Sequence, residues 1–301
     1  MNDLLLSDET DLPFYSPYNC IPGVDREILV EEVVRPWLSA FLEDPDHSVR
    51  VDGGLVLHSH LEWDSAYFGF PIYKLHATFG VQRRAALTRL VRDMELKHEK
   101  FYLYADVASE HTATLQAMTG LGFRLIEPRI TFLRDRLSSF DEPRHAVRRA
   151  RLEDIPRLRD VAAQCANEFD RVHADSCFPD EIANGYLATY AENSVRGFAD
   201  VVLVPDAENV PVKAFLAGAY SLEGCTKLGL EVSRLVLGAV HVECSGWYRK
   251  LISEMTCDMR DNGSDCILMT TQAANRAAIR TMENLGYRIG VTTQILAYAR
   301  P

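Results

Sequence analysis

The chain has 301 residues, 47% of them hydrophobic, so a sizeable core is available and the length suggests about two domains. Its formal net charge of −11 and pI of about 5.3 disfavour broad electrostatic binding to nucleic acid. No apolar run approaches the ~18 residues of a membrane-spanning helix, and the acidic N-terminus lacks the basic and apolar regions of a secretory signal. We therefore expect a cytoplasmic protein that binds neither nucleic acid nor membrane.

The cysteines and histidines indicate no metal site. The seven cysteines are scattered and form no C-x-x-C pair, which predicts reduced, mostly buried thiols rather than a disulfide framework or a zinc site. His58 and His60 lie two apart on one face of a strand expected over residues 55–61, a spacing that can ligate metal. No third ligand is apparent nearby, so a plain strand face is the favoured interpretation.

The first half of the chain is expected to begin with an irregular lead-in over residues 1–24. Residues 25–42 have the apolar spacing of a helix that Pro36 kinks or splits. The run from Trp63 to Phe70, W-D-S-A-Y-F-G-F, is rich in aromatic residues and predicts a core strand that ends in a turn at Pro71. The other elements expected here are helices over 81–100 and 109–122, the second capped by Ser109, and a strand over 101–107.

The second half of the chain follows a polar, turn-rich run at 138–144, which we interpret as a linker. A strand over 147–151 then leads into a helix whose first turn contains acidic residues and Pro156. Further elements are expected as a helix over 180–193, strands over 201–204, 213–222 and 227–240, and a helix over 246–261.

The last stretch, from Cys266 to Tyr298, reads as strand, helix and strand. Gly286 ends the helix because glycine adopts the left-handed conformation of a helix stop without steric cost. Its N-x-x-A-I and L-G-Y elements, from Asn275 to Tyr287, resemble the C-terminal motif of the GNAT superfamily of acyl-CoA N-acyltransferases. The resemblance implies that this helix runs along an acyl-CoA and that the Asn275 side chain helps hold it. The run from Trp63 is similar to a segment of the TDP-fucosamine acetyltransferase type of GNAT protein.

The chain also repeats itself. Residues 113–124 (ATLQAMTGLGFR) align without gaps with 277–288 (AAIRTMENLGYR), and helix, strand, helix, Gly and strand occur in the same order in both places. We infer an α/β (α+β) fold of two tandem GNAT-like domains, each a mixed, mostly antiparallel sheet flanked by helices. In the first copy His111 replaces Asn275 and no phosphate-cradling loop precedes the long helix, so we expect no cofactor there.

The domain boundaries follow from this repeat. We expect a degenerate GNAT-like domain over 25–137, the linker over 138–144 and an acyltransferase domain over 145–301 that folds alone. Within the last domain, the central strands are expected to separate after about Val240 and to leave a cofactor cleft.

The resemblance also implies where an acyl donor lies. Backbone groups of the central strand would pair with the pantetheine arm, and a loop before the next helix would hold the pyrophosphate. This loop departs from the family pattern, because Tyr248 and Lys250 stand where small residues are expected. We therefore expect Arg249 and Lys250 to hold the donor through their charge. The complete set of implied donor contacts is Leu235, Val236, Leu237, Ser245, Gly246, Trp247, Arg249, Lys250 and Asn275.

Catalytic groups are fewer. In GNAT proteins a carboxylate on the central strand often acts as a base, and Glu231 is the carboxylate available here; an ordinary ion-paired or solvated glutamate is the alternative. The tyrosine that protonates the leaving thiolate in the fucosamine type is replaced by Met282, and Tyr298 is a weak substitute.

The acceptor side is implied by a third similarity. A run resembling that of the fucosamine type places Arg171, His173 and Asp175 near the acceptor. Arginine can hold a phosphate with two hydrogen bonds and aspartate can accept from sugar hydroxyls. A solvated loop is the alternative interpretation.

The function expected from these residues is an N-acyltransferase that moves an acetyl or other acyl group from acyl-CoA, without a metal, to a small-molecule amine, with an amino-sugar nucleotide as one candidate. Two alternatives stay open. Glu231 to Arg234 is also similar to a motif of acyl-homoserine-lactone synthases, which use a carrier-protein-bound donor, and a non-catalytic ligand-binding protein on a decayed fold is the other. A homodimer is also left open.

Overall fold

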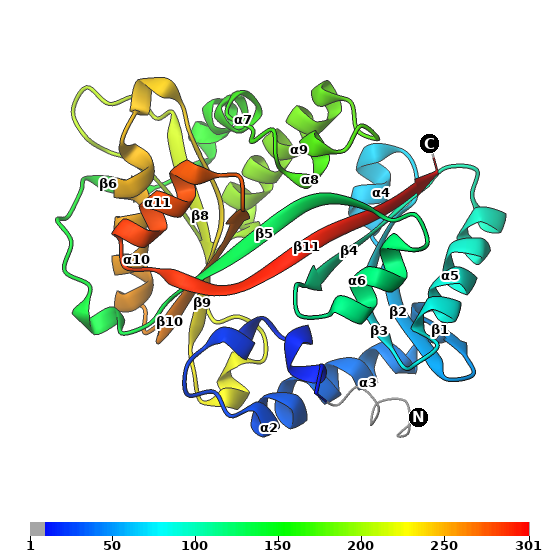
Figure 1. Ribbon diagram of the computed structural model, residues 1–301. Coiled ribbons are helices and arrows are strands. Elements are labelled where there is room, and N and C mark those ends of the chain that lie inside the picture. Colours follow the sequence, from blue (N-terminus) through cyan, green and yellow to red (C-terminus); the bar gives the residue numbers. More distant parts are fainter. Residues whose placement is uncertain (1–9, 301) are drawn as a thin grey trace. The chain divides into compact units, whose positions relative to one another are not determined.

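The computed structural model describes residues 10–300 and divides into two compact units (Figure 1). The first unit comprises the chain up to Arg129 together with the residues from Val291 onward, and the second comprises Ile130–Gly290. Each unit is described by itself.

The sheet of the first unit is mixed and mostly antiparallel. The β3–β4 pair is parallel, whereas β1–β2, β2–β3 and β4–β11 are antiparallel. Across the sheet its strands are β1 (Ser48–Val51), β2 (Gly54–His60), β3 (Ile72–Phe79), β4 (Phe101–Ala108) and the last part of β11 (Arg288–Arg300). The first residues of β5 (Arg124–Arg134) also belong to this unit.

Helices cover both faces of this sheet. Helices α5 (Arg83–Lys97) and α6 (Thr112–Thr119) pack on one face, and the helical stretch α2, η3 and α3 packs on the other. That stretch runs as α2 (Arg26–Leu29), a π turn η3 (Val30–Val34) and α3 (Arg35–Glu43). The π turn ends two residues before Pro36, whose nitrogen has no hydrogen to donate to the preceding turn, so the expected interruption of the helix by this proline is confirmed. The short helices are η1 (Leu12–Tyr15), η2 (Pro17–Cys20), η4 (Pro45–His47) and α4 (Glu62–Phe68).

Two local predictions in this unit were wrong. The run from Trp63 forms helix α4 rather than a strand, because acidic residues stand in its first turn, Gly69 (φ 76°) stops it, and Trp63 stacks on Tyr67 one helical turn later. Trp63 is 42% exposed and is not a core residue. Ser109 does not cap α6, since its hydroxyl accepts from Thr292 instead and the helix begins after His111.

The second unit repeats this plan. Helices α10 (Trp247–Asp261) and α11 (Arg276–Asn284) pack on one face of its sheet, and α7 (Ile155–Gln164) and α9 (Asp180–Asn193) pack on the other. The strands lie in the order β5, β10 (Cys266–Gln272), β9 (Val232–Val240), β8 (Ala214–Ala219), β7 (Val201–Pro205) and β6 (Val147–Arg149). The remaining short helices are η5 (Leu137–Ser139), η6 (Leu152–Asp154), α8 (Arg171–Ala174), η7 (Ser194–Phe198), η8 (Cys225–Leu228) and η9 (Val242–Cys244).

The internal repeat is confirmed down to the register of the strands. In the first unit the β2–β3 ladder shifts by one residue at His76, directly after Leu75, the last residue of β3 paired with β4. In the second unit the β8–β9 ladder shifts in the same way at Val236, directly after Leu235, the last residue of β9 paired with β10. This β-bulge makes Thr78 the counterpart of Gly238.

The last strand of each sequence repeat, β5 or β11, lies partly in the other unit rather than in the domain expected from the sequence. Residues Thr293–Arg300 of β11 pair antiparallel with β4 in the first unit, and Ile130–Arg134 of β5 belong to the second unit. The compact units therefore cross the boundaries 25–137 and 145–301 drawn from the sequence. Independent folding of 145–301 remains a prediction.

The expected linker is also part of the second unit. Glu142 pairs with Arg249 at 2.7 Å, Arg144 pairs with the buried Glu254 at 3.0 Å, and the carbonyl of Phe140 accepts from Arg260 at 3.0 Å. These contacts hold residues 138–144 against helix α10.

Candidate functional site

The candidate donor site begins where two parallel strands separate. Val232–Leu235 of β9 pair with Cys266–Met269 of β10, but β9 continues to Val240 and β10 continues to Gln272. The strands therefore part after Leu235, five residues earlier than the sequence suggested, because the bulge at Val236 interrupts the regular strand. Beyond this point no strand among residues 10–300 pairs with the edge of β9 that faced β10.

Gly238 presents its backbone to this opening, as its counterpart in the first unit shows. Both the N–H and the C=O of Thr78 are bonded to the Tyr15 hydroxyl, so they point away from the neighbouring strand β2. Gly238 occupies the same register opposite Leu216 on β8, so its N–H and C=O point away from β8. Backbone groups alternate along a strand, and those of Leu237 therefore point toward β8. Gly238 was missed in the sequence, although extending the repeat through the bulge identifies it.

The loop before α10 lies at the next step of the chain. Gly246 is exposed and caps the helix with φ 84°, and Ser245 beside it is also exposed. From the bulge to the first residue of the helix there are twelve residues in this unit, Val236 to Trp247, and eight in the first unit, His76 to Arg83. Only the second unit therefore has a longer loop at the N-terminus of its long helix, where backbone N–H groups favour an anion.

The side chains around this loop are already engaged. Trp247 is buried in the core under α10, and Lys250 Nζ lies 4.7 Å from the centre of its indole ring. Arg249 forms its ion pair with Glu142, so a donor phosphate would compete with that carboxylate. Tyr248 packs against the same core, and burial raises the pKa of its hydroxyl to about 12.

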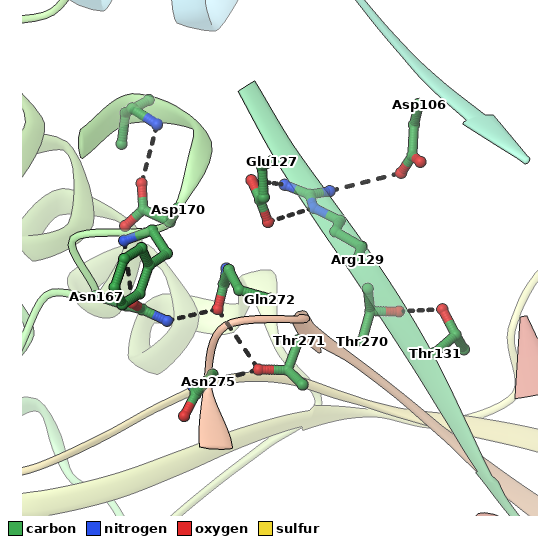
Figure 2. A network of polar contacts seen from close by, with 12 residues as sticks. Asp106, Glu127, Arg129, Thr131, Asn167, Asp170, Thr270, Thr271, Gln272 and Asn275 are labelled. Carbon is green, nitrogen blue, oxygen red and sulfur yellow. Dashed lines mark hydrogen bonds and ion pairs between the residues drawn. The ribbon is translucent and has the colours of Figure 1, made fainter. Parts of the chain in front are cut away.

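Asn275 belongs to a polar chain at the end of β10 (Figure 2). Its Oδ1 accepts from the N–H of Ala278 at 3.1 Å, which caps helix α11, and its Nδ2 donates to Thr271 at 3.3 Å. Thr271 in turn donates to Gln272, which accepts from Asn167 at 2.7 Å. The loop between α7 and α8 is thereby tied to the end of β10 that extends beyond its pairing with β9.

The expected catalytic residues lie elsewhere. Glu231 precedes β9 and accepts from Ser221 at 2.7 Å, and four paired residues separate it from the opening, about 13 Å along the strand. Tyr298 belongs to the first unit, where its hydroxyl donates to Glu95 at 2.7 Å and its ring packs on Phe101 and Phe123. The hydrogen bond to Glu95, together with burial, raises the pKa of Tyr298. Glu231 therefore lies away from the opening of β9, and Tyr298 belongs to the other unit.

The three expected acceptor residues are gathered at α8 but point into the protein. Arg171 and Asp175 are buried, at 8% and 0% exposure, and Asp175 accepts from the N–H of Cys177. Both ring nitrogens of His173 are within hydrogen-bond distance of oxygen atoms, Asp170 Oδ2 at 2.7 Å and Asn184 Oδ1 at 3.0 Å. His173 therefore orders this segment, and the alternative of a simple solvated loop does not describe it.

A separate charged group occupies the first unit. Glu127 is fully buried and accepts from Arg129 at 2.6 and 3.1 Å, and Arg129 also lies 3.5 Å from Asp106 (Figure 2). A buried carboxylate requires such a partner. In residues 10–300 no three His, Cys, Asp or Glu side chains are grouped as metal ligands. None of the helices in this same part of the chain combines the length and hydrophobicity that a bilayer crossing requires.

Comparison with known proteins rests on structure alone, since no family model and no curated protein matches the sequence. A GCN5-related N-acetyltransferase from Sphaerobacter thermophilus is similar with a TM-score of 0.54 and 12% identity, over 93% of this chain and 87% of that one. A tandem GNAT protein from the clavulanic acid biosynthesis pathway is similar with a TM-score of 0.52 and 11% identity, over 98% and 95% of the two chains. The chain has a tandem GNAT fold.

A GCN5-related N-acetyltransferase from Kribbella flavida agrees, with a TM-score of 0.51 and 16% identity over 89% of this chain and 96% of that one. These structural similarities establish the GNAT fold, and at 11–16% sequence identity they do not establish the substrate. The fucosamine type suggested by the run from Trp63 stays a prediction.

Proposed function

We propose that the protein is an N-acyltransferase whose second unit binds an acyl-CoA at the opening between β9 and β10. The observation that carries this proposal is the early separation of these strands after Leu235 and Met269, on a GNAT fold. The separation leaves the Gly238 N–H and C=O directed to the open side, where they can pair with the amide groups of a pantetheine arm.

The reaction follows from this placement. An acceptor amine attacks the carbonyl carbon of the thioester, the new C–N bond forms as the C–S bond breaks, and the proton lost by the amine is finally taken up by the thiolate. Backbone N–H groups at the opening can stabilise the charge that develops on the carbonyl oxygen. We propose a small-molecule amine as the acceptor, with the segment at α8 ordering the acceptor side.

The donor part is tested by Gly238→Pro, which removes the N–H that faces the opening but breaks no bond to β8. Gly238→Ala retains this N–H and is the matched control, since its Cβ would meet only the end of Leu216 and ordinary neighbours. We expect Gly238→Pro to weaken acetyl-CoA binding roughly fivefold in calorimetry, the loss of one hydrogen bond, and Gly238→Ala to change it little. Equal affinity of the two variants would contradict the proposed donor position.

A second candidate is a ligand-binding protein without catalytic activity. It is favoured by the position of Glu231, the expected base, which lies about 13 Å along the strand from the opening of β9. Release of free thiol from acetyl-CoA with a panel of small amines distinguishes the two, because binding without thiol release supports the second. Thiol release only from an acylated carrier protein would support a carrier-protein donor instead.

A further inference from the structure

The first unit contains the same strand opening as the second. Its parallel strands β3 and β4 pair from Ile72 to Leu75, and β3 then continues to Phe79 while β4 continues to Ala108. An unpaired strand edge inside a protein must find other partners for its N–H and C=O groups.

These partners come from the lead-in of the chain. The Tyr15 hydroxyl donates to the carbonyl of Thr78 at 2.9 Å and accepts from the N–H of Thr78 at 3.4 Å. One side chain therefore satisfies both backbone groups that Thr78 directs to the open side.

The ring of Tyr15 packs against three other rings. Its ring centre lies 5.0 Å from Phe79, 4.7 Å from His111 and 6.3 Å from Trp37. His111 stands at the position that Asn275 occupies in the second copy, and its Nε2 lies 3.2 Å from the carbonyl oxygen of Asp11. Burial lowers the pKa of His111, so the neutral ring is favoured in this apolar setting.

The side chain of Thr78 is bonded to a second threonine, on helix α6. Thr78 and Thr114 are hydrogen-bonded to each other through their hydroxyls at 2.8 Å, and both are nearly inaccessible to solvent. Their counterparts in the second unit are Gly238 and Ala278, which have no side-chain polar group to form such a bridge. The chemistry that fills the opening is therefore specific to the first unit.

The segment that carries Tyr15 is firmly docked. Leu12 is completely buried among Leu38, Leu57 and other residues of the core on the α2–α3 face. Asp25 then caps the helix that follows, since its side chain accepts from the N–H groups of Glu27 and Ile28. Within the expected irregular lead-in, residues 10–24 thus form part of the fold, and residues 1–9 lie outside the described residues.

We propose that Tyr15 is the built-in occupant of a donor-type opening in the first unit, and that removal of its side chain creates a binding site there. The site would take a phenol-sized ligand that both donates and accepts a hydrogen bond at Thr78. While Tyr15 is in place, the opening is closed to an extended amide chain. The proposal concerns the first unit alone and does not depend on the donor function proposed for the second.

The test uses the full chain and hydrogen exchange at the Thr78 amide. Tyr15→Phe retains the ring but removes the hydroxyl, and we expect Thr78 to exchange roughly two- to tenfold faster, as for one lost hydrogen bond. Tyr73→Phe is the matched control, because it removes a hydroxyl bonded to His98 at 2.8 Å in the same unit and should leave Thr78 unchanged. Unchanged exchange in Tyr15→Phe would overturn the proposal.

The binding site is tested with Tyr15→Ala and phenol, which is the side chain that this variant lacks beyond Cβ. We expect added phenol to restore the protection of Thr78, and benzene, which lacks the hydroxyl, to restore it less. No effect of phenol, or an equal effect of benzene, would overturn the proposed site. Neither measurement involves an acyl donor, so a failure of the proposed transferase function would leave both results unchanged.

Discussion

The guanidinium of Arg134 lies directly over Gly286, and its Nη1 donates to the carbonyl of that glycine at 2.7 Å. Gly286 has φ 73° and ends helix α11, and any Cβ there would overlap Nη1. Gly286→Ala should therefore combine the cost of a left-handed alanine with displacement of Arg134. We expect a loss of ~2–4 kcal/mol in the free energy of unfolding, measured with urea.

A second glycine separates the cost of the left-handed backbone from the cost of displacing Arg134. Gly263 has φ 89° in the same unit, and a Cβ built there meets no atom within 4 Å. Gly263→Ala should lose only the ~1–2 kcal/mol of the backbone conformation. Similar losses in the two variants would mean that Arg134 moves aside without cost.

Two histidines of the first unit predict a dependence of stability on pH. Burial, followed by the charges of His47 and Lys97, lowers the pKa of His58 to about 4. Burial, followed by the charge of Lys74, lowers the pKa of His76 to about 3. The unfolded chain binds these protons near the ordinary value of 6.5, so stability is lost as the pH falls from about 6.5 toward 4.

Each histidine binds at most one proton on unfolding, so each can change the free energy of unfolding by up to about 1.4 kcal/mol per pH unit. Urea unfolding at pH 7, 6 and 5 measures the slope. The variant His58→Gln with His76→Gln should show a smaller decrease between these pH values than the natural chain. An identical slope in the double variant would assign the pH dependence to other groups.

The ion pair between Arg249 and Glu142 makes a prediction about donor binding, which rests on the proposed function. If Arg249 leaves Glu142 to contact a phosphate, Glu142→Gln should tighten binding, because it removes the competing charge. The double change Arg249→Ala with Lys250→Ala should weaken binding by ~1–3 kcal/mol. Calorimetry with acetyl-CoA at low and high salt measures both, and the natural chain should depend more strongly on salt than the double variant.

A matched control for these charges lies further along the same helix. Glu254→Gln also removes a carboxylate that binds an arginine, Arg144, but Glu254 is buried and does not belong to the loop at Gly246. It should change stability rather than donor affinity. Equal effects of Glu142→Gln and Glu254→Gln on affinity would contradict a role for Arg249.

Local sequence was sufficient where periodicity and stop signals decide the structure. The helix expected over 180–193 has those bounds, and the helix stopped by Gly286 is capped by Asn275. The repeat between 113–124 and 277–288 also predicted the tandem fold. These features depend on neighbours within a few turns of the chain.

Long-range pairing was not predictable in this way. Nothing near Tyr15 indicates that its hydroxyl bonds to a residue 63 positions away. The aromatic run from Trp63 favoured a strand by composition, but the helix is decided by its stop at Gly69. For the site, the bulge that fixes Gly238 becomes visible only from the strand register.

The pairing of β11 with β4 in the first unit is also a long-range feature, and it leads to the last prediction. β5 and β11 follow similar sequences with the same helix stop, so local signals cannot decide which of β4 and β10 each strand accompanies. In the structure, residues 293–300 of β11 pair with residues 101–108 of β4. A fragment of residues 145–301 therefore retains this segment without its partner, and it lacks β5.

A fragment of residues 124–290 retains β5 and ends before the segment that pairs with β4. We expect 124–290 to unfold cooperatively in urea and to remain monomeric at low concentration. We expect 145–301 to unfold less cooperatively or to associate, because it exposes unpaired strand edges. Circular dichroism during urea titration and size-exclusion chromatography measure both properties. If the 145–301 fragment were instead monomeric and unfolded cooperatively, and the 124–290 fragment were unfolded, the domain boundaries drawn from the sequence would be supported. The pairing of β11 with β4 would then contribute little to stability.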